Sequence, residues 1–82
     1  MKTNDLKKST RIKLANGWSA TLEDNKHGNI RMATVEGFYT EMGSIYAHDI
    51  VSYFSTEADR FMPVEHTEAQ LKCKTMNEQL FG

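Results

Sequence analysis

Cysteine, proline and long apolar runs are nearly absent from this chain of 82 residues. The single cysteine, Cys73, has no partner for an internal disulfide, which favours a reducing compartment. No stretch approaches the roughly 18 apolar residues that a membrane-spanning helix requires. The first residues, Met1 to Leu6, contain no apolar run, so we expect no signal peptide. Together these absences predict a soluble protein of the cytoplasm.

Neither sign of charge is in excess, because 10 Lys and Arg residues face 11 Asp and Glu residues, for a net charge of −1. Binding of long nucleic acid needs a basic surface, and mimicry of DNA needs a large acidic excess, so the composition favours neither. Apolar residues make up 39% of the chain and charged residues 26%, which is typical of a folded domain rather than a disordered tail. At this length we expect a single domain, residues 1–82, with a small core.

Residues 10–55 alternate between apolar and polar positions and are interrupted by glycine turns, a pattern that predicts an antiparallel sheet. Five short strands are expected, over residues 11–14, 18–23, 30–40, 44–47 and 50–54. Asn16-Gly17 marks a hairpin between the first two strands. A two-residue turn would put Leu14 and Trp18 on opposite faces, whereas a one-residue bulge at Gly17 would put them on the same face. We favour the bulge, because both side chains belong in the core.

The sheet is expected to close into a small barrel. The third strand is apolar on both faces near Met32-Ala33, and a small open sheet would leave exposed edges. Pro63 argues against a further central strand. The expected segments are a polar lead-in (residues 1–9), a five-stranded barrel or strongly bent sheet (10–55) and a connecting loop (56–66).

A helix is predicted over residues 67–81. Thr67 is an N-cap candidate, and Gln70 three positions later completes a capping box. Gly82 follows where a C-cap glycine is expected. Four small or apolar residues share one face of this helix: Ala69, Cys73, Met76 and Leu80. We expect that face to pack against one open side or end of the barrel, so the predicted fold class is mainly β with one C-terminal helix.

Four segments of the chain resemble SH3-like β-barrels of the KOW type. They are a charged opening strand, a glycine turn, part of a long central hairpin and a closing turn into the last strand: Leu6–Leu14, Asn16-Gly17-Trp18, Ala33–Gly37 and Ser44–Ile50. The acidic-aromatic loop pattern of peptide-binding SH3 domains is missing, so the resemblance does not imply binding of proline-rich peptides. The basic excess of nucleic-acid-binding KOW modules is missing too.

The whole chain is also similar in style to small proteins that phages and other mobile elements encode. Small phage proteins of this size often act by stoichiometric binding to a host factor, and inhibitors of CRISPR defence complexes are one example. This resemblance implies a host protein or complex as the partner, contacted in the host cytoplasm.

The sequence contains no convincing set of catalytic or metal-binding residues. His27, His48, His66 and Cys73 lack the short spacings of zinc ligands, so we expect neither a metal nor another cofactor. His48 and Asp49 are adjacent, and on a strand they would point to opposite faces rather than address one substrate together. We favour a short turn at this point, which Asp49 caps and in which His48 packs or forms a hydrogen bond. Cys73 lies on the apolar face of the predicted helix, where a small core residue is the simpler interpretation. We therefore expect a non-enzyme.

Aromatic pairs supply candidate contact residues. Phe38 and Tyr39 are consecutive near a turn, and so are Tyr53 and Phe54, so one ring of each pair should point away from the core. Exposed aromatic rings commonly anchor protein interfaces, although burial of both rings between barrel and helix is an equally good interpretation.

Basic residues of the second loop and its neighbouring strands are the other candidates. Arg11, Lys26, His27 and Arg31 would form a local anion-binding or nucleic-acid-binding patch if they cluster. The simpler interpretation is a solvated charged face, because acidic residues are interspersed: Glu23, Asp24 and Glu36. The candidate interaction surface as a whole consists of Lys26, His27, Arg31, Phe38, Tyr39 and Tyr53.

Three functions remain open at this point. The first is a non-enzymatic binding protein that contacts a host protein or complex through these surface groups. The second is a nucleic-acid or ribonucleoprotein-associated module that uses the basic patch. The third and weakest is a homo-oligomer that sequesters a small ligand between its subunits. We favour the first, with no membrane among its partners.

Overall fold

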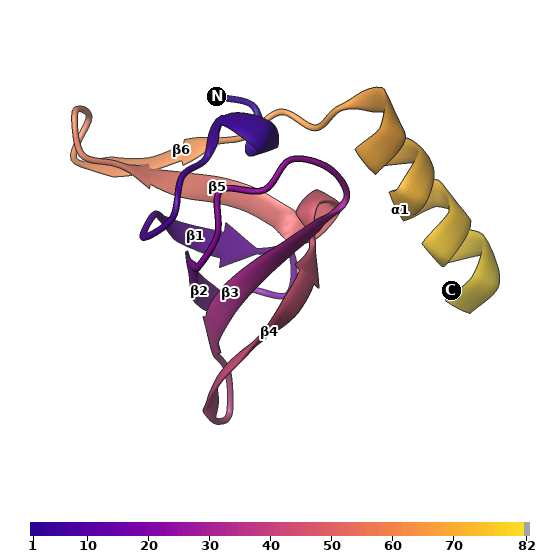
Figure 1. Ribbon diagram of the computed structural model, residues 1–82, viewed down its shortest axis with the longest axis horizontal. Coiled ribbons are helices and arrows are strands. Elements are labelled where there is room, and N and C mark those ends of the chain that lie inside the picture. Colours follow the sequence, from indigo (N-terminus) through magenta and orange to yellow (C-terminus); the bar gives the residue numbers. More distant parts are fainter. Residues whose placement is uncertain (82) are drawn as a thin grey trace.

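The computed structural model describes residues 1–81 as one antiparallel sheet of six strands and one C-terminal helix (Figure 1). The strands lie in the order β4-β3-β2-β1-β5-β6, so β4 and β6 are the two edges. Their bounds are β1 (Arg11–Leu14), β2 (Ser19–Leu22), β3 (Ile30–Glu36), β4 (Thr40–Tyr46), β5 (Ile50–Ser55) and β6 (Arg60–Pro63). Two short 3₁₀ turns, η1 (Thr3–Asp5) and η2 (Ala47–Asp49), and the helix α1 (Glu68–Phe81) complete the fold. The C-cap expected at Gly82 lies outside the described residues.

The expected class, mainly β with a C-terminal helix, is confirmed, but the sheet is open and has six strands. The additional strand is β6, which lies within the segment that was expected to be a connecting loop, residues 56–66. β6 pairs with β5 alone and therefore forms an edge. An edge is the place in a sheet that tolerates Pro63, since its missing N–H leaves no ladder bond unmade on the outer side.

The turn between β1 and β2 is the bulged hairpin that the sequence favours. Gly17 has a φ of +91°, and its N–H donates to the Leu14 carbonyl oxygen at 2.9 Å. The Leu14 N–H donates to the Trp18 carbonyl oxygen at 2.8 Å, so these two residues face each other across the hairpin. A three-residue loop with glycine in the left-handed region gives this arrangement.

The core is a single small cluster on the concave face of the curled sheet. Its buried members come from the lead-in segment and from four strands: Leu6, Ile12, Leu14, Ala20, Leu22, Ala33 and Ile50. Tyr53 and Val35 are half-buried against this cluster, and so are Ile45 and Val64. Two of the seven buried residues are alanines, so the centre of the sheet supplies little volume to fill the space inside the curl.

Arg31 does not lie on the surface, where the sequence placed it, but is completely buried. Its Nε donates to Asp24 Oδ1 at 2.7 Å, and its two Nη atoms donate to the carbonyl oxygens of Thr3, Leu6 and Asp24 at 2.8–3.0 Å. The guanidinium group thus fastens the lead-in segment and the β2–β3 loop to the start of β3. Arg31 shares the core-facing side of β3 with Ala33 and Val35, so the adjacent Ile30 lies on the other side and is exposed.

The capping box at the start of α1 is confirmed. Thr67 Oγ1 accepts the Gln70 N–H at 3.2 Å, and Gln70 Oε1 accepts the Thr67 N–H at 2.9 Å. Gln70 is also fully buried, because Oε1 accepts the Thr3 hydroxyl at 2.6 Å and Nε2 donates to the Gly28 carbonyl oxygen at 2.9 Å. The N-terminal turn of the helix is therefore held by polar contacts with two other segments.

The expectation that an apolar helical face packs on the sheet is wrong. Met76 and Leu80 are 59% and 71% exposed, Ala69 is exposed and Cys73 is half-buried. The helix extends away from the sheet (Figure 1), and its main contact is with η2. The hydrogen bonds of Gln70 fix the position of the helix, because each of its buried polar atoms has a partner. The fold offers the apolar face of the helix only the small surface of η2. Within residues 1–81, no helix is long and apolar enough to cross a membrane.

Candidate functional site

The six candidate surface residues do not form one surface. Lys26 and His27 are exposed on the β2–β3 loop, Arg31 is buried beneath that loop, and Phe38 and Tyr39 lie at the other end of β3. β3 has seven residues, so its ends are roughly 20 Å apart at ~3.3 Å per residue. The sixth candidate is half-buried against the core: Tyr53.

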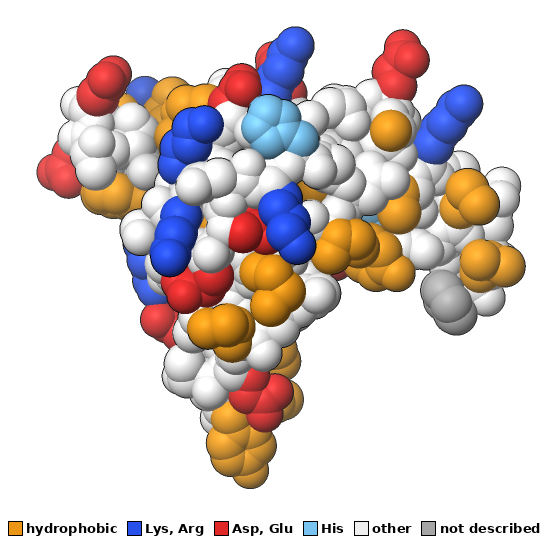
Figure 2. All heavy atoms as spheres, in the orientation of Figure 1, with side chains coloured by type: hydrophobic (Ala, Val, Ile, Leu, Met, Phe, Trp, Pro, Cys, Tyr) orange, Lys and Arg blue, Asp and Glu red, His pale blue; other side chains and the backbone are white. Residues whose placement is uncertain are grey.

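Two of the four basic residues of the candidate nucleic-acid patch, Arg11 and Arg31, are paired with carboxylates. Arg11 forms a two-point ion pair with Glu36, with Nη1–Oε1 at 2.7 Å and Nη2–Oε2 at 3.1 Å. The hydrogen bond from Arg11 lowers the pKa of Glu36, and the same bond raises the pKa of Arg11. Figure 2 shows that the basic side chains on the visible face are interspersed with acidic ones. This distribution agrees with the simpler interpretation, a solvated face of mixed charge.

The tip of the β3–β4 hairpin is apolar and exposed, in contrast to the face of mixed charge. Phe38 and Tyr39 are 90% and 79% exposed, so both rings point away from the core rather than one of them. The tip forms an apolar projection at the bottom of Figure 2. Trp18 packs edge-on against Phe38, with ring centroids 5.7 Å apart at 81°.

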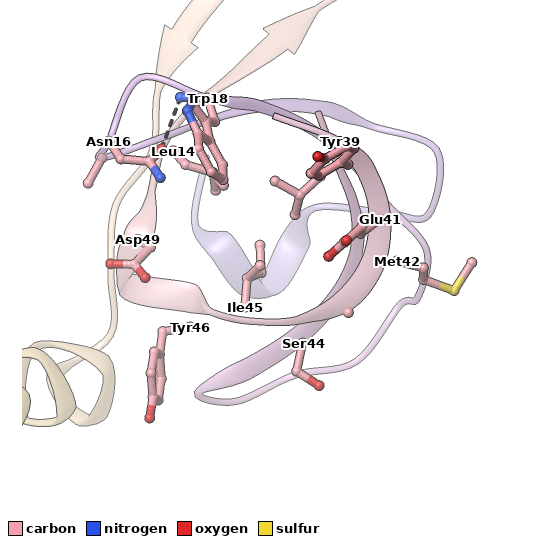
Figure 3. A pocket seen from close by; sticks show the side chains of 13 residues that line it. Leu14, Asn16, Trp18, Tyr39, Glu41, Met42, Ser44, Ile45, Tyr46 and Asp49 are labelled. Atoms are coloured by element: carbon pink, nitrogen blue, oxygen red, sulfur yellow. Dashed lines mark hydrogen bonds between the residues drawn. The ribbon is translucent and has the colours of Figure 1, made fainter. Parts of the chain in front are cut away.

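A groove of about 490 Å³ opens beside this tip, on the concave side of the sheet. We call it the β4 groove. It runs between the β1–β2 turn and β4, and Figure 3 looks into it. Its lining residues are Leu14, Ala15, Asn16, Trp18, Val35, Tyr39, Glu41, Met42, Gly43, Ser44, Ile45, Tyr46 and Asp49. A volume of this size is within the range of small-ligand and peptide side-chain pockets.

One wall of the β4 groove is the Trp18 ring. The backbone N–H of Trp18 donates to Asn16 Oδ1 at 2.9 Å (Figure 3), and this hydrogen bond orders the β1–β2 turn that positions the ring. The ring stands directly over Gly37, where a Cβ atom would meet Trp18 Cε3 at 2.6 Å. Gly37 therefore serves to admit the indole ring.

The opposite wall is β4. Figure 3 shows Glu41 and Ile45 pointing into the curl, while Met42, Ser44 and Tyr46 point away from it. Gly43 lies between the two inward residues, and a Cβ atom there would meet nothing within 4 Å. The middle of the groove is consequently open above Gly43.

The charged residues that line the groove are both acidic. They are Glu41 and Asp49, and no Lys or Arg is among the lining residues. The rest of the lining is largely aromatic or aliphatic. The β4 groove is therefore an apolar surface with a local negative potential, suited to an apolar group accompanied by a positive charge.

His48 and Asp49 lie in η2, so the short turn expected at these residues is confirmed. His48 Nδ1 is 3.3 Å from Asp49 Oδ1, so the two side chains are in contact rather than on opposite faces. His48 is buried, stacks on Tyr46 with ring centroids 4.9 Å apart, and contacts the Asn77 amide through Nε2 at 3.2 Å. Its position between β4 and α1 makes it a packing residue that holds the helix.

Chemistry-bearing residues do not gather elsewhere in the described chain. Among residues 1–81, no three His, Cys, Asp or Glu side chains are grouped so that they could hold a metal ion. Cys73 is a free, half-buried thiol on α1. The comparisons add no family: no protein-family model matches the chain, and neither a curated protein nor a solved structure does.

Proposed function

We propose that this protein is a non-enzymatic binding protein that holds an apolar, basic segment of a partner protein in the β4 groove. The observation that carries the proposal is the exposure of two aromatic rings beside an apolar groove. Tyr39 lines the groove, and Phe38 packs against the Trp18 ring that forms one of its walls. Two neighbouring aromatic rings exposed to water are unfavourable for a monomer that binds nothing. Aromatic residues are also among the commonest anchors of protein interfaces.

The charge of the groove supports a basic partner segment. Glu41 and Asp49 line it, and within residues 1–81 neither forms an ion pair with Lys or Arg, so a Lys or Arg of the partner would gain a charge-assisted hydrogen bond there. Acidic segments would be repelled by the same two carboxylates. Recognition of this kind contributes mainly to specificity and to the rate of association.

We further propose that the curled sheet is a variant of the SH3-like barrel. The bulged glycine turn, the long β3–β4 hairpin and the η2 turn that leads directly into β5 support this assignment. β6 and α1 are then additions after the last strand of that barrel. The host-directed role implied by the resemblance to phage proteins, such as inhibition of a defence complex, is the biological form that this binding would take.

The nucleic-acid alternative has lost part of its basis. Burial of Arg31 and pairing of Arg11 with Glu36 remove two of the four basic groups on which it rested. Their loss favours the protein-binding hypothesis over the nucleic-acid one.

The test is selection of binders from a random peptide display library on the immobilised full chain. We expect enrichment of sequences that combine large apolar residues with Lys or Arg. Tyr39→Ser should weaken the selected peptides by about tenfold or more, since an interface anchor commonly contributes more than ~1.4 kcal/mol. Leu80→Ser, which removes a similarly exposed apolar residue on α1, should leave their affinity unchanged.

Three results would overturn the proposal. The first is the absence of any enriched peptide, and the second is an equal loss of affinity in the Tyr39 and Leu80 variants. The third is tight binding of random single-stranded oligonucleotides that falls steeply as salt rises, which would support the nucleic-acid alternative.

A further inference from the structure

The two edges of the sheet differ in how they are protected against pairing with another strand. β6 carries Arg60 and Pro63, a charge and a missing N–H that both discourage pairing. The chain just beyond it is covered, because the Glu65 N–H donates to the Met1 carbonyl oxygen at 2.9 Å and Glu65 O accepts the Thr3 N–H at 3.0 Å. β4 likewise carries a single charged residue, Glu41, but it contains no proline, so every residue along it keeps its N–H.

Two backbone hydrogen bonds at the ends of the β3–β4 pair show which residues of β4 direct their N–H and C=O groups toward β3 and which direct them outward. The Gly37 N–H donates to the Tyr39 carbonyl oxygen at 3.1 Å, and the Ala47 N–H donates to the Asn29 carbonyl oxygen at 2.8 Å. Bonds alternate along an antiparallel pair, so the backbone groups of residues 41, 43 and 45 face β3. Those of residues 40, 42, 44 and 46 face outward, and those of residues 40, 42 and 44 take part in no further backbone bond within residues 1–81.

The outward backbone groups and the β4 groove belong to the same strand. Glu41 and Ile45 point into the groove (Figure 3), and Gly43 leaves open space between them. A seventh strand on this edge would continue the concave wall, and every second side chain of that strand would enter the groove. An extended peptide that adds to a sheet edge needs backbone hydrogen bonds from the edge and pockets for alternate side chains. The outer side of β4 offers the first, and the β4 groove offers the second.

We infer that the partner segment binds as an extended strand that pairs antiparallel with β4. This inference rests on the proposed function and specifies how its ligand is recognised. The side chains of the segment that face Ile45, Gly43 and Glu41 would be, in chain order, apolar, large aromatic and basic, each separated by one residue. The aromatic position follows from the open space above Gly43, since a ring opposite a glycine covers its bare backbone. The basic position follows from the charge of Glu41.

The probe is a synthetic peptide, acetyl-Thr-Ile-Thr-Phe-Thr-Lys-Thr-amide, titrated into the isotope-labelled full chain. We expect hydrogen exchange of the Met42 and Ser44 amides to slow by about tenfold or more as the peptide saturates, because these N–H groups gain a partner. Amides of β6 should be unchanged. Exchanging the phenylalanine and lysine of the peptide for alanine and glutamate should abolish binding.

N-methylation provides the matched control on the peptide. The amides of the second and third threonines would face β4, so methylating both should weaken binding by about tenfold or more, since two backbone bonds are lost. The amides of the isoleucine and phenylalanine would face away, and methylating those should have little effect. On the protein, Ser44→Pro removes one outward N–H at an edge that tolerates proline, and it should weaken binding with an unchanged melting temperature.

The outcomes separate this inference from the proposed function. Peptides selected from the random library that bind with full affinity to the Ser44→Pro variant, or that leave the Met42 and Ser44 amides unprotected, would overturn strand addition while the groove remains a binding site. Failure of every library peptide would overturn the proposed function itself. Protection of the same amides without peptide, increasing with protein concentration, would show pairing with a second copy and would also overturn the inference.

Discussion

The two ends of the β3–β4 hairpin reverse the usual distribution of polarity between the inside and the surface of a protein. At the base, the guanidinium group of Arg31 is completely buried. At the tip, the Phe38 and Tyr39 rings are almost fully in water. Charged side chains are rarely buried and large aromatic ones are rarely this exposed, so each end departs from the general rule in the opposite direction.

The difference teaches which end holds the fold and which is free for binding. The base joins the lead-in segment, the β2–β3 loop and α1 through Arg31 and Gln70, whose polar atoms are satisfied by those segments. The tip makes no comparable connection: the main contact of the Phe38 ring is an edge-on one with Trp18. We therefore expect substitutions at the base to change stability and substitutions at the tip to change binding.

The largest loss of stability is expected for Asp24→Ala. Asp24 is the charged partner of Arg31, at 2.7 Å, and its removal leaves a buried cation without compensation. Such a change typically costs about 3–5 kcal/mol. Asp24→Asn should cost less, because the amide oxygen still accepts a hydrogen bond. Chemical denaturation measures the free energy of unfolding of each variant.

Glu36→Gln is the matched control for that substitution, because it breaks an ion pair with Arg11 that is exposed to solvent. Its effect should be far smaller than that of Asp24→Ala. A loss below about 1 kcal/mol for Asp24→Ala would mean that the base is not held by this pair.

Acid should reproduce part of the Asp24 effect in the unaltered protein. Burial alone would raise the pKa of Asp24, but hydrogen bonds from Arg31 and from two backbone N–H groups hold it below the ordinary value of 3.8. A carboxyl with a lowered native pKa stabilises the fold fully above its unfolded value, and this contribution is lost as the pH falls through the native value. The urea concentration at the unfolding midpoint, measured from about pH 6 to pH 3, should begin to decrease once the pH is below about 4. This decrease should be smaller in the Asp24→Ala variant. Parallel curves for the two proteins would contradict the assignment.

Features of the fold that depend on local sequence were predictable. The bulge at Gly17 follows from a glycine turn between alternating residues, and the capping box of Thr67 and Gln70 follows from a spacing of three. Both are settled by groups a few residues apart. The strand count was less accessible, because β6 is a four-residue edge strand that contains Pro63 and so resembles a loop in sequence.

The features that the sequence did not predict depend on contacts between distant residues. β3 has apolar residues on both faces, so its pattern did not show which face would be buried, and the partners that bury Arg31 lie up to 28 positions away. The β4 groove arises because Gly43 pairs with Ala33 in register, which places two small residues together on the concave face. No spacing along the chain reveals such a pairing. The exposed aromatic tip alone was suggested by two consecutive rings near a turn.

Gln70→Ala should have the next largest effect on stability. It removes half of the capping box and leaves the buried Thr3 hydroxyl without its acceptor at 2.6 Å, at a cost of about 1–3 kcal/mol. Gln79→Ala, in an exposed position of the same helix, is the matched control and should change little. Thermal unfolding followed by circular dichroism measures both. Equal melting temperatures for the two variants would show that α1 is not held by Gln70.

Phe38→Ser should have the smallest effect on stability and sharpens the comparison most directly. The ring is 90% exposed, so its removal gives up little burial, and the free energy of unfolding should change by no more than about 0.5 kcal/mol. The same variant should bind the selected peptides less tightly, because the Trp18 wall of the β4 groove loses the aromatic ring that packs against it. A loss of stability above about 1 kcal/mol would mean that the Trp18–Phe38 contact contributes to the fold, and the tip would then no longer differ in kind from the base.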